Sequence, residues 1–237
     1  SWVQRIMPAL RRHDPSVRTL LHVGDFWMET APVDYWARAA GIERVLVTLG
    51  NHEPYDKYAP LLALHPGSAV RISDAVWLLP RPWRFNIGGR SFLSLGGASS
   101  VDRDQRTEGK DWWPDEEILE EHVEAARHLP ADVMITHESP NDTPVESARR
   151  LFRTNPQRFS SPSLQAPSRS REKISRVWDA VRPNLLLHGH LHLSAADTTE
   201  DGRRVISLGS DNMQGNIVLL ATKTLETEAL PPRLLTL

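Results

Sequence analysis

The sequence predicts an α/β fold in which two mixed β-sheets pack face to face as a sandwich, flanked by helices. Short apolar runs rich in branched aliphatic residues alternate with amphipathic segments near both ends of the chain, a pattern typical of parallel β/α units. Residues 70–95 instead read as several short strands in succession. Because 237 residues can bury one substantial core and no linker is visible, the sequence predicts a single domain over residues 1–237.

The chain opens with a helix predicted over residues 2–12, with Ser1 as its N-cap. It leads into a strand that ends at Gly24-Asp25. A second helix starts at residue 32 or 33 and ends at Gly41, a residue type that favours the left-handed conformation of a helix C-terminus. The buried face of this second helix is predicted to carry Tyr35, Trp36 and Ala39.

The next strand covers residues 45–49, and a loosely helical segment follows at residues 55–64. Four short strands come after it. Between the last two, Gly88-Gly89 predicts a tight hairpin turn, since both positions tolerate positive φ. The four strands are predicted at residues 70–72, 76–79, 83–87 and 90–95.

The second half begins with a polar loop, residues 98–113, that leaves the last of these strands through Gly96-Gly97. Pro114 then starts an acidic helix, and a strand ends at His137. Residues 141–170 are rich in Ser, Pro and Arg, which predicts a long and partly mobile loop. The remaining elements are a helix over 171–181, a strand over 185–187, and two antiparallel strands over 203–208 and 216–221.

Composition excludes several classes of function. The formal net charge of −2 gives no electrostatic reason to favour nucleic acid as a partner. No apolar stretch approaches the roughly 20 residues that cross a bilayer, so we expect a cytoplasmic protein without a membrane partner. The chain has no cysteine, so any metal must be held by nitrogen and oxygen ligands.

Polar side chains follow four of the predicted strands at the point where each strand ends. The carboxyl ends of parallel strands are where open α/β sheets bind ligands, so we expect these side chains to converge. Imidazole, carboxylate and amide groups together suit Mn, Fe, Co, Ni or Zn better than Mg or Ca. A pair of such ions about 3.5–4 Å apart supports in-line attack at phosphorus. The side chains are Asp25, then Asn51, His52 and Glu53, then His137, then His188, His190 and His192.

The order and spacing of these residues resemble the successive motifs of the calcineurin-like metallophosphoesterase superfamily. The motifs are Gly24-Asp25, Gly50-Asn51-His52-Glu53, His137 and Gly189-His190-Leu191-His192. The resemblance implies a four-layer αββα sandwich and a site for two divalent transition metal ions, manganese first, with iron, zinc, cobalt or nickel as alternatives. It also implies an enzyme that hydrolyses a small phosphomonoester or phosphodiester by attack of a metal-bridging hydroxide.

The resemblance further implies a role for each matching residue. Asp25 would bridge the two metals. Asn51, His137 and His190 would complete the second metal site, and His192 would bind the first metal. His52 would be the catalytic histidine, off the metals and facing the leaving group.

The chain departs from the family pattern in two places. Phe26-Trp27 follows Gly24-Asp25, which argues against the protein serine/threonine phosphatases, whose motif reads Gly-Asp-x-Val-Asp-Arg-Gly. The family's first motif, Asp-x-His at the end of a strand, has no counterpart before Gly24. We therefore expect an N-terminal extension that supplies this strand, and only one strongly bound metal without it. Two alternatives remain open: a catalytically silent scaffold, as in the retromer-type member of the superfamily, and a nuclease.

A few further residues allow two interpretations. Arg103 and Arg106, in the polar loop, either bind the substrate phosphate or belong to a solvated surface. Trp112 and Trp113 either form a stacking platform or, as we favour, anchor the next helix in the core. Glu53 either orders the loop that carries His52 or is a solvated carboxylate. His188 alternates in phase with His190 and His192, and we expect it to be structural or to support the ligands.

Overall fold

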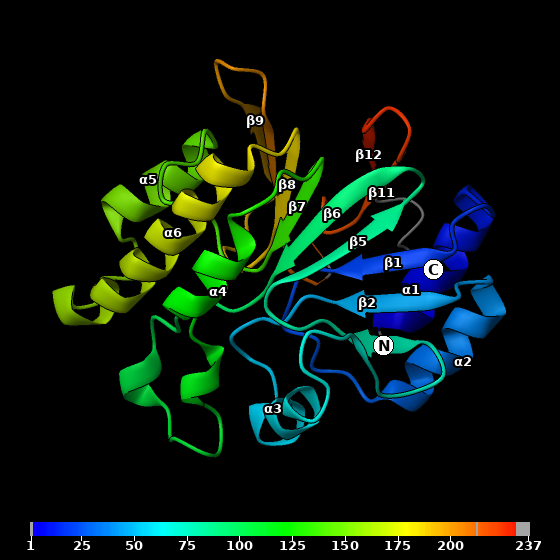
Figure 1. Ribbon diagram of the computed structural model, residues 1–237, viewed down its shortest axis with the longest axis horizontal. Coiled ribbons are helices and arrows are strands. Elements are labelled where there is room, and N and C mark those ends of the chain that lie inside the picture. The colour runs from blue at the N-terminus through cyan, green and yellow to red at the C-terminus, as the bar shows by residue number, and fades with distance from the viewer. Residues whose placement is uncertain (1, 212, 231–237) are drawn as a thin grey trace.

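Two mixed sheets form the centre of the molecule (Figure 1). The computed structural model describes residues 2–211 and 213–230, and Trp2 only in its backbone, so the predicted cap at Ser1 lies outside the described residues. One sheet has the strand order β1-β2-β4-β3 and the other β5-β6-β7-β8-β10-β9, while β11 and β12 form a separate two-stranded sheet. The strands are β1 Thr19–His22, β2 Arg44–Val47, β3 Val70–Arg71, β4 Val76–Leu78, β5 Trp83–Ile87, β6 Arg90–Leu95, β7 Val133–Thr136, β8 Leu185–His188, β9 Ala195–Thr198, β10 Arg204–Ser207, β11 Val218–Leu220 and β12 Thr227–Ala229.

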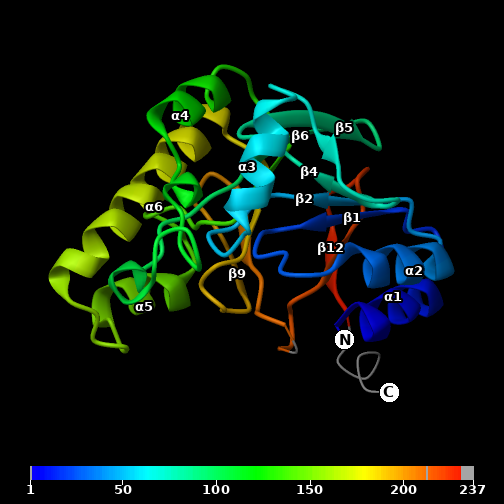
Figure 2. The ribbon, with the colours of Figure 1, turned by 90° about the horizontal axis from the view of Figure 1, so that it is seen from below.

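Helices cover the outer face of each large sheet, which gives the predicted four-layer αββα sandwich (Figures 1 and 2). Helices α1 and α2 lie on the side of the four-stranded sheet, and α4, α5 and α6 lie on the opposite side of the molecule (Figure 2). The helices are α1 Trp2–His13, α2 Thr30–Ala40, α3 Tyr55–Ala63, α4 Glu120–Ala126, α5 Glu146–Thr154 and α6 Ser161–Val181, with 3₁₀ turns at Arg103–Gln105 and Pro114–Glu116.

Separate apolar clusters hold the layers together, because burial of apolar side chains on both faces of a parallel sheet stabilises it. Val3 and Met7 of α1 pack with Val45 and Val47 of β2 beneath the helices. Trp178 of α6 belongs to the cluster on the outer face of the six-stranded sheet. The cluster on that sheet's other face comprises Phe92, Val133, Ile135, Leu185, Leu187, Ile206, Leu208 and Leu225, with the partly buried Leu21, Val23, Phe85, Ile87, Val218 and Leu220 against it.

Local turn and cap signals predicted several elements correctly. Gly88 and Gly89 join β5 to β6 with φ values of 58° and 80°, as the hairpin prediction required. Gly41 ends α2 in the left-handed conformation. The predicted buried face of α2 was wrong for Tyr35, which is 63% exposed, and for Ala39, which is also exposed, while Trp36 packs half-buried against the core. The buried residues of α2 are Val33, Ala37 and Ala40.

The prediction of a long loop over residues 141–170 was wrong, because α5 and the first half of α6 lie there. Ser160 caps α6 by accepting a hydrogen bond from the Ser163 amide, and Pro162 lies in the first turn, where no amide hydrogen is needed. Pro167 is inside the helix but buried. Burial of one face of α6 thus outweighs the weak helix propensity of its Ser- and Pro-rich half.

The last strands also differ from the prediction. β10 pairs antiparallel with β9, but it pairs parallel with β8 and so extends the six-stranded sheet. β11 is antiparallel, as predicted, with β12 as its partner. Strand direction follows from the path of the connecting chain, which the residues of a short strand do not encode.

Candidate active site

Residues at the carboxyl ends of strands from both large sheets meet at one place. Asp25 follows β1 and Asn51 follows β2, while His137 follows β7 and His190 follows β8. The Nε2 atom of His137 lies 3.0 Å from Oδ1 of Asn51 and 3.4 Å from Oδ1 of Asp25. The ring centroids of His137 and His190 are 4.9 Å apart. The sandwich therefore brings together residues that lie up to 165 positions apart in the chain (190 − 25).

Glycine at two positions allows this close approach. A Cβ atom on Gly24 would lie 2.2 Å from Nδ1 of His137, and one on Gly50 would lie 2.1 Å from Oδ1 of Asp25. Both distances are far shorter than a van der Waals contact between a carbon atom and these atoms. The glycines of the two motifs are therefore required by the packing of the site itself.

Three of the predicted ligands have strained backbones. Asp25, His190 and His192 have φ values of 57°, 63° and 53°, in the left-handed region that favours glycine. Such conformations cost on the order of 1–3 kcal/mol each and persist where the surrounding structure imposes them, often at functional sites. Their concentration at these strand ends favours a functional role for the cluster.

His137 and Asp25 form an ion pair in which His137 is buried and Asp25 is partly exposed. Burial alone would lower the pKa of His137, but the Asp25 carboxylate outweighs it and raises this pKa to about 9. Burial acts to raise the pKa of Asp25, and the neighbouring His137 reverses this and holds it well below its usual range. Nδ1 of His137 lies 2.6 Å from the Val23 carbonyl oxygen, to which it donates, so Nε2 faces the site.

His52 lies beside this pair, with its ring against Arg106. The His52 amide donates to Oδ1 of Asp25 at 2.9 Å. The Arg106 guanidinium lies 2.6 Å from Nδ1 and 2.9 Å from Nε2 of the ring, and a neutral imidazole can accept at only one of them. Burial, together with the positive charge of Arg106, lowers the pKa of His52 against the opposing effect of Asp25. Arg106 is fixed in turn by Asp102 at 2.8 Å and by the Asp111 carbonyl at 3.1 Å.

Glu53 orders the loop that carries His52 and is not a solvated carboxylate, the other interpretation made from the sequence. Its side chain is fully buried and accepts hydrogen bonds from the amides of Phe26 and Gly50, at 3.1 Å and 3.0 Å. Burial raises its pKa to about 7. One carboxyl group thus ties the Gly-Asp turn to the Gly-Asn-His turn.

A buried chain of hydrogen bonds that the sequence did not predict orients Asn51. Its Nδ2 atom donates to Oγ of Ser100 at 2.9 Å, which directs its Oδ1 atom toward His137. Ser100 in turn donates to both oxygens of Glu116, from its amide at 2.7 Å and from its hydroxyl at 2.8 Å. Burial raises the pKa of Glu116 to about 7. The feature of the sequence that could have predicted this close packing is the run of small residues after Gly96-Gly97.

Glu138 is a second residue that the sequence analysis missed. It follows His137 directly and is fully buried, and its Oε2 atom lies 4.0 Å from Nε2 of His190. That oxygen has no hydrogen-bond partner among the described residues. Burial raises the pKa of Glu138 to about 7. Its position next to a strand-end histidine was the only signal for it in the sequence.

The remaining predicted residues lie at the border of the site or outside it. His192 is exposed but lines the same cavity as Asp25 and His137. Arg103 is exposed, with its guanidinium 4.2 Å from the centre of the Trp112 ring. Trp112 is 5% exposed, in line with the favoured core-anchor interpretation.

Trp113 and His188 have the packing and contacts of structural residues. Trp113 packs against the cluster beneath α1 and α2, so it too anchors the core. His188 is fully buried at the end of β8, with Nδ1 3.1 Å from the Gly189 carbonyl oxygen.

The donor atoms at the centre of the site have the spacing of ligands to one metal ion. Ligand atoms about 2.0–2.2 Å from a common ion lie about 3 Å apart at right angles, and somewhat further at the tetrahedral angle. The distances from His137 to Asn51 and Asp25 fall in this range. Residues 2–211 and 213–230 contain no group of three His, Asp or Glu side chains placed to hold an ion, and the third donor here is an amide oxygen. The same two distances are those of a hydrogen bond from His137 to Asn51 and an ion pair with Asp25, so a metal ion held by these residues is a proposal.

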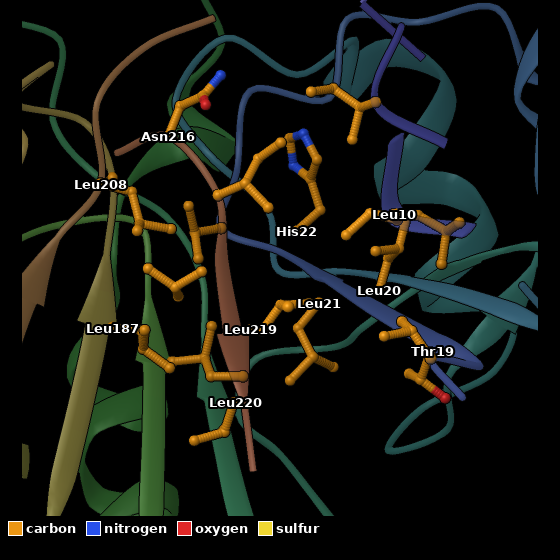
Figure 3. Close-up of a pocket in the computed structure, with 18 of the residues that line it drawn as sticks. Leu10, Thr19, Leu20, Leu21, His22, Leu187, Leu208, Asn216, Leu219 and Leu220 are labelled. Carbon is orange, nitrogen blue, oxygen red and sulfur yellow. The ribbon is translucent and has the colours of Figure 1, made fainter. Parts of the chain in front are cut away.

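A cavity of about 1280 Å³ adjoins the site and extends between β1 and β11. Figure 3 shows Leu20, Leu21 and His22 of β1 and Leu219 and Leu220 of β11 lining it, with Leu187 and Leu208 at the left of the view. Within the described residues β1 pairs only with β2, so its other edge is free. At one end the lining includes Asp25 and His137.

The calcineurin-like phosphoesterase family model matches residues 2–194. The chain belongs to this family. The match covers every motif residue from Asp25 to His192, and the family's activity, hydrolysis of phosphate esters, is in keeping with a site built from these groups. A search of curated proteins finds no match. In the part of the chain that the structure describes, no helix has the length and apolar character needed to cross a bilayer.

Several solved structures are similar to this chain at low identity. A Staphylococcus aureus protein assigned as a 5′-nucleotidase, in complex with α-ketoglutarate, is 17% identical over 96% of this chain and 46% of its own, with a TM-score of 0.45. The 5′-nucleotidase of Candida albicans SC5314 is 13% identical over 88% and 41%, with a TM-score of 0.42. GAP50, the anchor in the inner membrane complex of Plasmodium, is 13% identical over 90% and 67%, with a TM-score of 0.41. The chain spans less than half the length of either nucleotidase.

Proposed function

We propose that this chain is a metal-dependent phosphoesterase that hydrolyses a small phosphomonoester or phosphodiester. The observation that carries the proposal is the convergence of Asp25, Asn51 and His137 at metal-ligand spacing, from strands of both sheets. The strained backbones of Asp25, His190 and His192 support it, since a purely structural cluster has no need of them.

We assign two divalent transition metal ions to the site, manganese first. Asp25, Asn51, His137 and His190 would hold one ion, and Asp25 with His192 would contribute to the other. Bound ions of this kind generate a nucleophile from water at neutral pH and neutralise charge on the phosphoryl oxygens. Asp25 and His192 alone are too few ligands for tight binding of the second ion.

The chain's own residues would hold the phosphate ester and assist the departure of its leaving group. Arg106 presents a guanidinium beside His52, where it can pair with a phosphoryl oxygen. His52 would hydrogen-bond or protonate the leaving oxygen, which in other enzymes contributes about 10²–10⁴ in rate. Arg103 would contribute at most at the border, because its guanidinium lies over Trp112.

We further propose that residues 1–237 act as one domain that takes an additional strand beside β1. Among the described residues β1 is the edge strand of its sheet, next to β2, and the adjoining cavity has a largely apolar lining. A strand parallel to β1 would end beside Asp25, at the edge where the other ligands meet. This placement agrees with the strand and Asp-x-His motif expected from the sequence.

The proposed function is tested by assaying the protein with Mn²⁺ on aryl phosphomonoesters and phosphodiesters, with and without a chelator. We expect metal-dependent hydrolysis that the His52→Ala variant largely loses. Metal binding without hydrolysis of any ester would instead support the catalytically silent scaffold. Cleavage of DNA or RNA without hydrolysis of small esters would support a nuclease.

A further inference from the structure

An exposed tryptophan lies next to the proposed catalytic histidine. Trp27 is 69% exposed, and its ring centroid lies 6.4 Å from that of His52, with the two rings nearly perpendicular. Phe26, the residue before it, is fully buried. Trp27 also belongs to the lining of the cavity that contains Asp25. A large aromatic side chain left in water at the mouth of a site calls for an explanation.

The position of Trp27 relative to His52 is fixed by shared anchors. The Glu53 carboxyl group accepts hydrogen bonds from the Phe26 amide on one turn and the Gly50 amide on the other. The Asp25 side chain accepts from the His52 amide across the same gap. These bonds hold the two turns together, so the backbone that carries Trp27 is fixed relative to the backbone that carries His52.

We propose that Trp27 is a stacking platform for an aromatic ring in the leaving group, so that the substrates are phosphate esters of the nucleoside class. This inference rests on the proposed function, in which His52 faces the leaving oxygen. The group attached to that oxygen must extend past His52, and the exposed indole face lies there. A flat ring joined to the ester through a sugar can reach this face, whereas the sugar alone leaves the indole in water. Stacking of a base on an aromatic side chain tolerates every base, because each base has a π-face.

The test compares adenosine 5′-monophosphate with ribose 5-phosphate, two esters that share the scissile bond and differ by the base. We expect the parent to prefer the nucleotide by about tenfold in kcat/KM, mostly through KM, a typical effect of one stacked base. Trp27→Ala should bring the nucleotide down to the level of the sugar phosphate, and Trp27→Phe should keep most of the preference. Tyr35→Ala is the matched control, since Tyr35 is 63% exposed and its ring packs against Trp36.

A second measurement separates this inference from the proposed function. Saturation-transfer NMR with adenosine 5′-monophosphate and metal-free protein reports contact with the base without any hydrolysis. We expect a base signal with the parent and Tyr35→Ala proteins that is lost with Trp27→Ala. A parent that shows no base contact, or a preference that survives Trp27→Ala, overturns the inference while leaving hydrolysis of other esters intact. A parent that hydrolyses no ester but gives a base signal dependent on Trp27 overturns the proposed function and leaves the platform standing.

Discussion

Replacement of Glu116 by glutamine should remove a defined part of the dependence of stability on pH. The Glu116 carboxyl group is fully buried and accepts two hydrogen bonds from Ser100, and burial raises its pKa from 4.5 to about 7. In the unfolded chain the group loses its proton near pH 4.5, but in the folded protein it keeps the proton up to about pH 7. Folding therefore takes up a proton in this window, so stability falls as pH rises from 4.5 through 7.

The magnitude follows from the two pKa values. One pKa unit corresponds to about 1.36 kcal/mol, so a rise from 4.5 to about 7 corresponds to about 3 kcal/mol of unfolding free energy lost by pH 8. The glutamine side chain of the variant cannot ionise and makes no such contribution. It also loses one acceptor for Ser100, which costs about 0.5–1.5 kcal/mol at every pH. Because a part of this loss falls below pH 5, the Glu116→Gln protein should gain about 2.5 kcal/mol relative to the parent between pH 5 and pH 8.

Urea unfolding at several pH values between 5 and 8 measures this difference. Glu53 and Glu138, whose pKa values are also raised to about 7, act equally in both proteins and cancel in the comparison. Asp115→Asn is the matched control, because it removes one negative charge from an exposed neighbour. A stability difference between Glu116→Gln and the parent that stays constant from pH 5 to pH 8 would refute the reasoning.

Three further predictions address the site. His52→Ala should lower kcat by about 10²–10⁴ with metal content and thermal stability near the parent values; a large loss of stability with normal activity per folded molecule would contradict this. Asn51→Ala and His137→Ala should each lower the metal content of purified protein, measured by elemental analysis, and unchanged content in both would exclude them as ligands. Arg106→Ala should raise KM with little effect on metal binding, because the Arg106 guanidinium lies beside His52. Arg103→Ala should leave KM near the parent value, because Arg103 lies over a buried tryptophan. Equal effects of the two variants on KM in steady-state kinetics would argue against this difference.

The sequence alone determined which residues end the strands. Each apolar run stops at a glycine or a polar residue, and the Gly-Asn-His-Glu segment and the strand-end His137 follow such runs directly. Strand and turn signals of this kind act over a few residues, so they can be recognised without the fold. The same is true of the Gly88-Gly89 hairpin and of the layer order that alternating strands and helices imply.

Only the tertiary structure decided which distant groups meet and which segments gain stability by burial. Arg106 contacts His52 across 54 positions, and Glu53 is buried against a turn 27 positions away, neither of which any local pattern encodes. The Ser- and Pro-rich first half of α6 is helical because one face of that helix is buried, and local propensity gives no sign of this. Phe26 and Trp27 are adjacent large aromatic residues that the sequence does not distinguish. Only the packing of the two turns buries Phe26 in the core and leaves Trp27 in solvent beside His52.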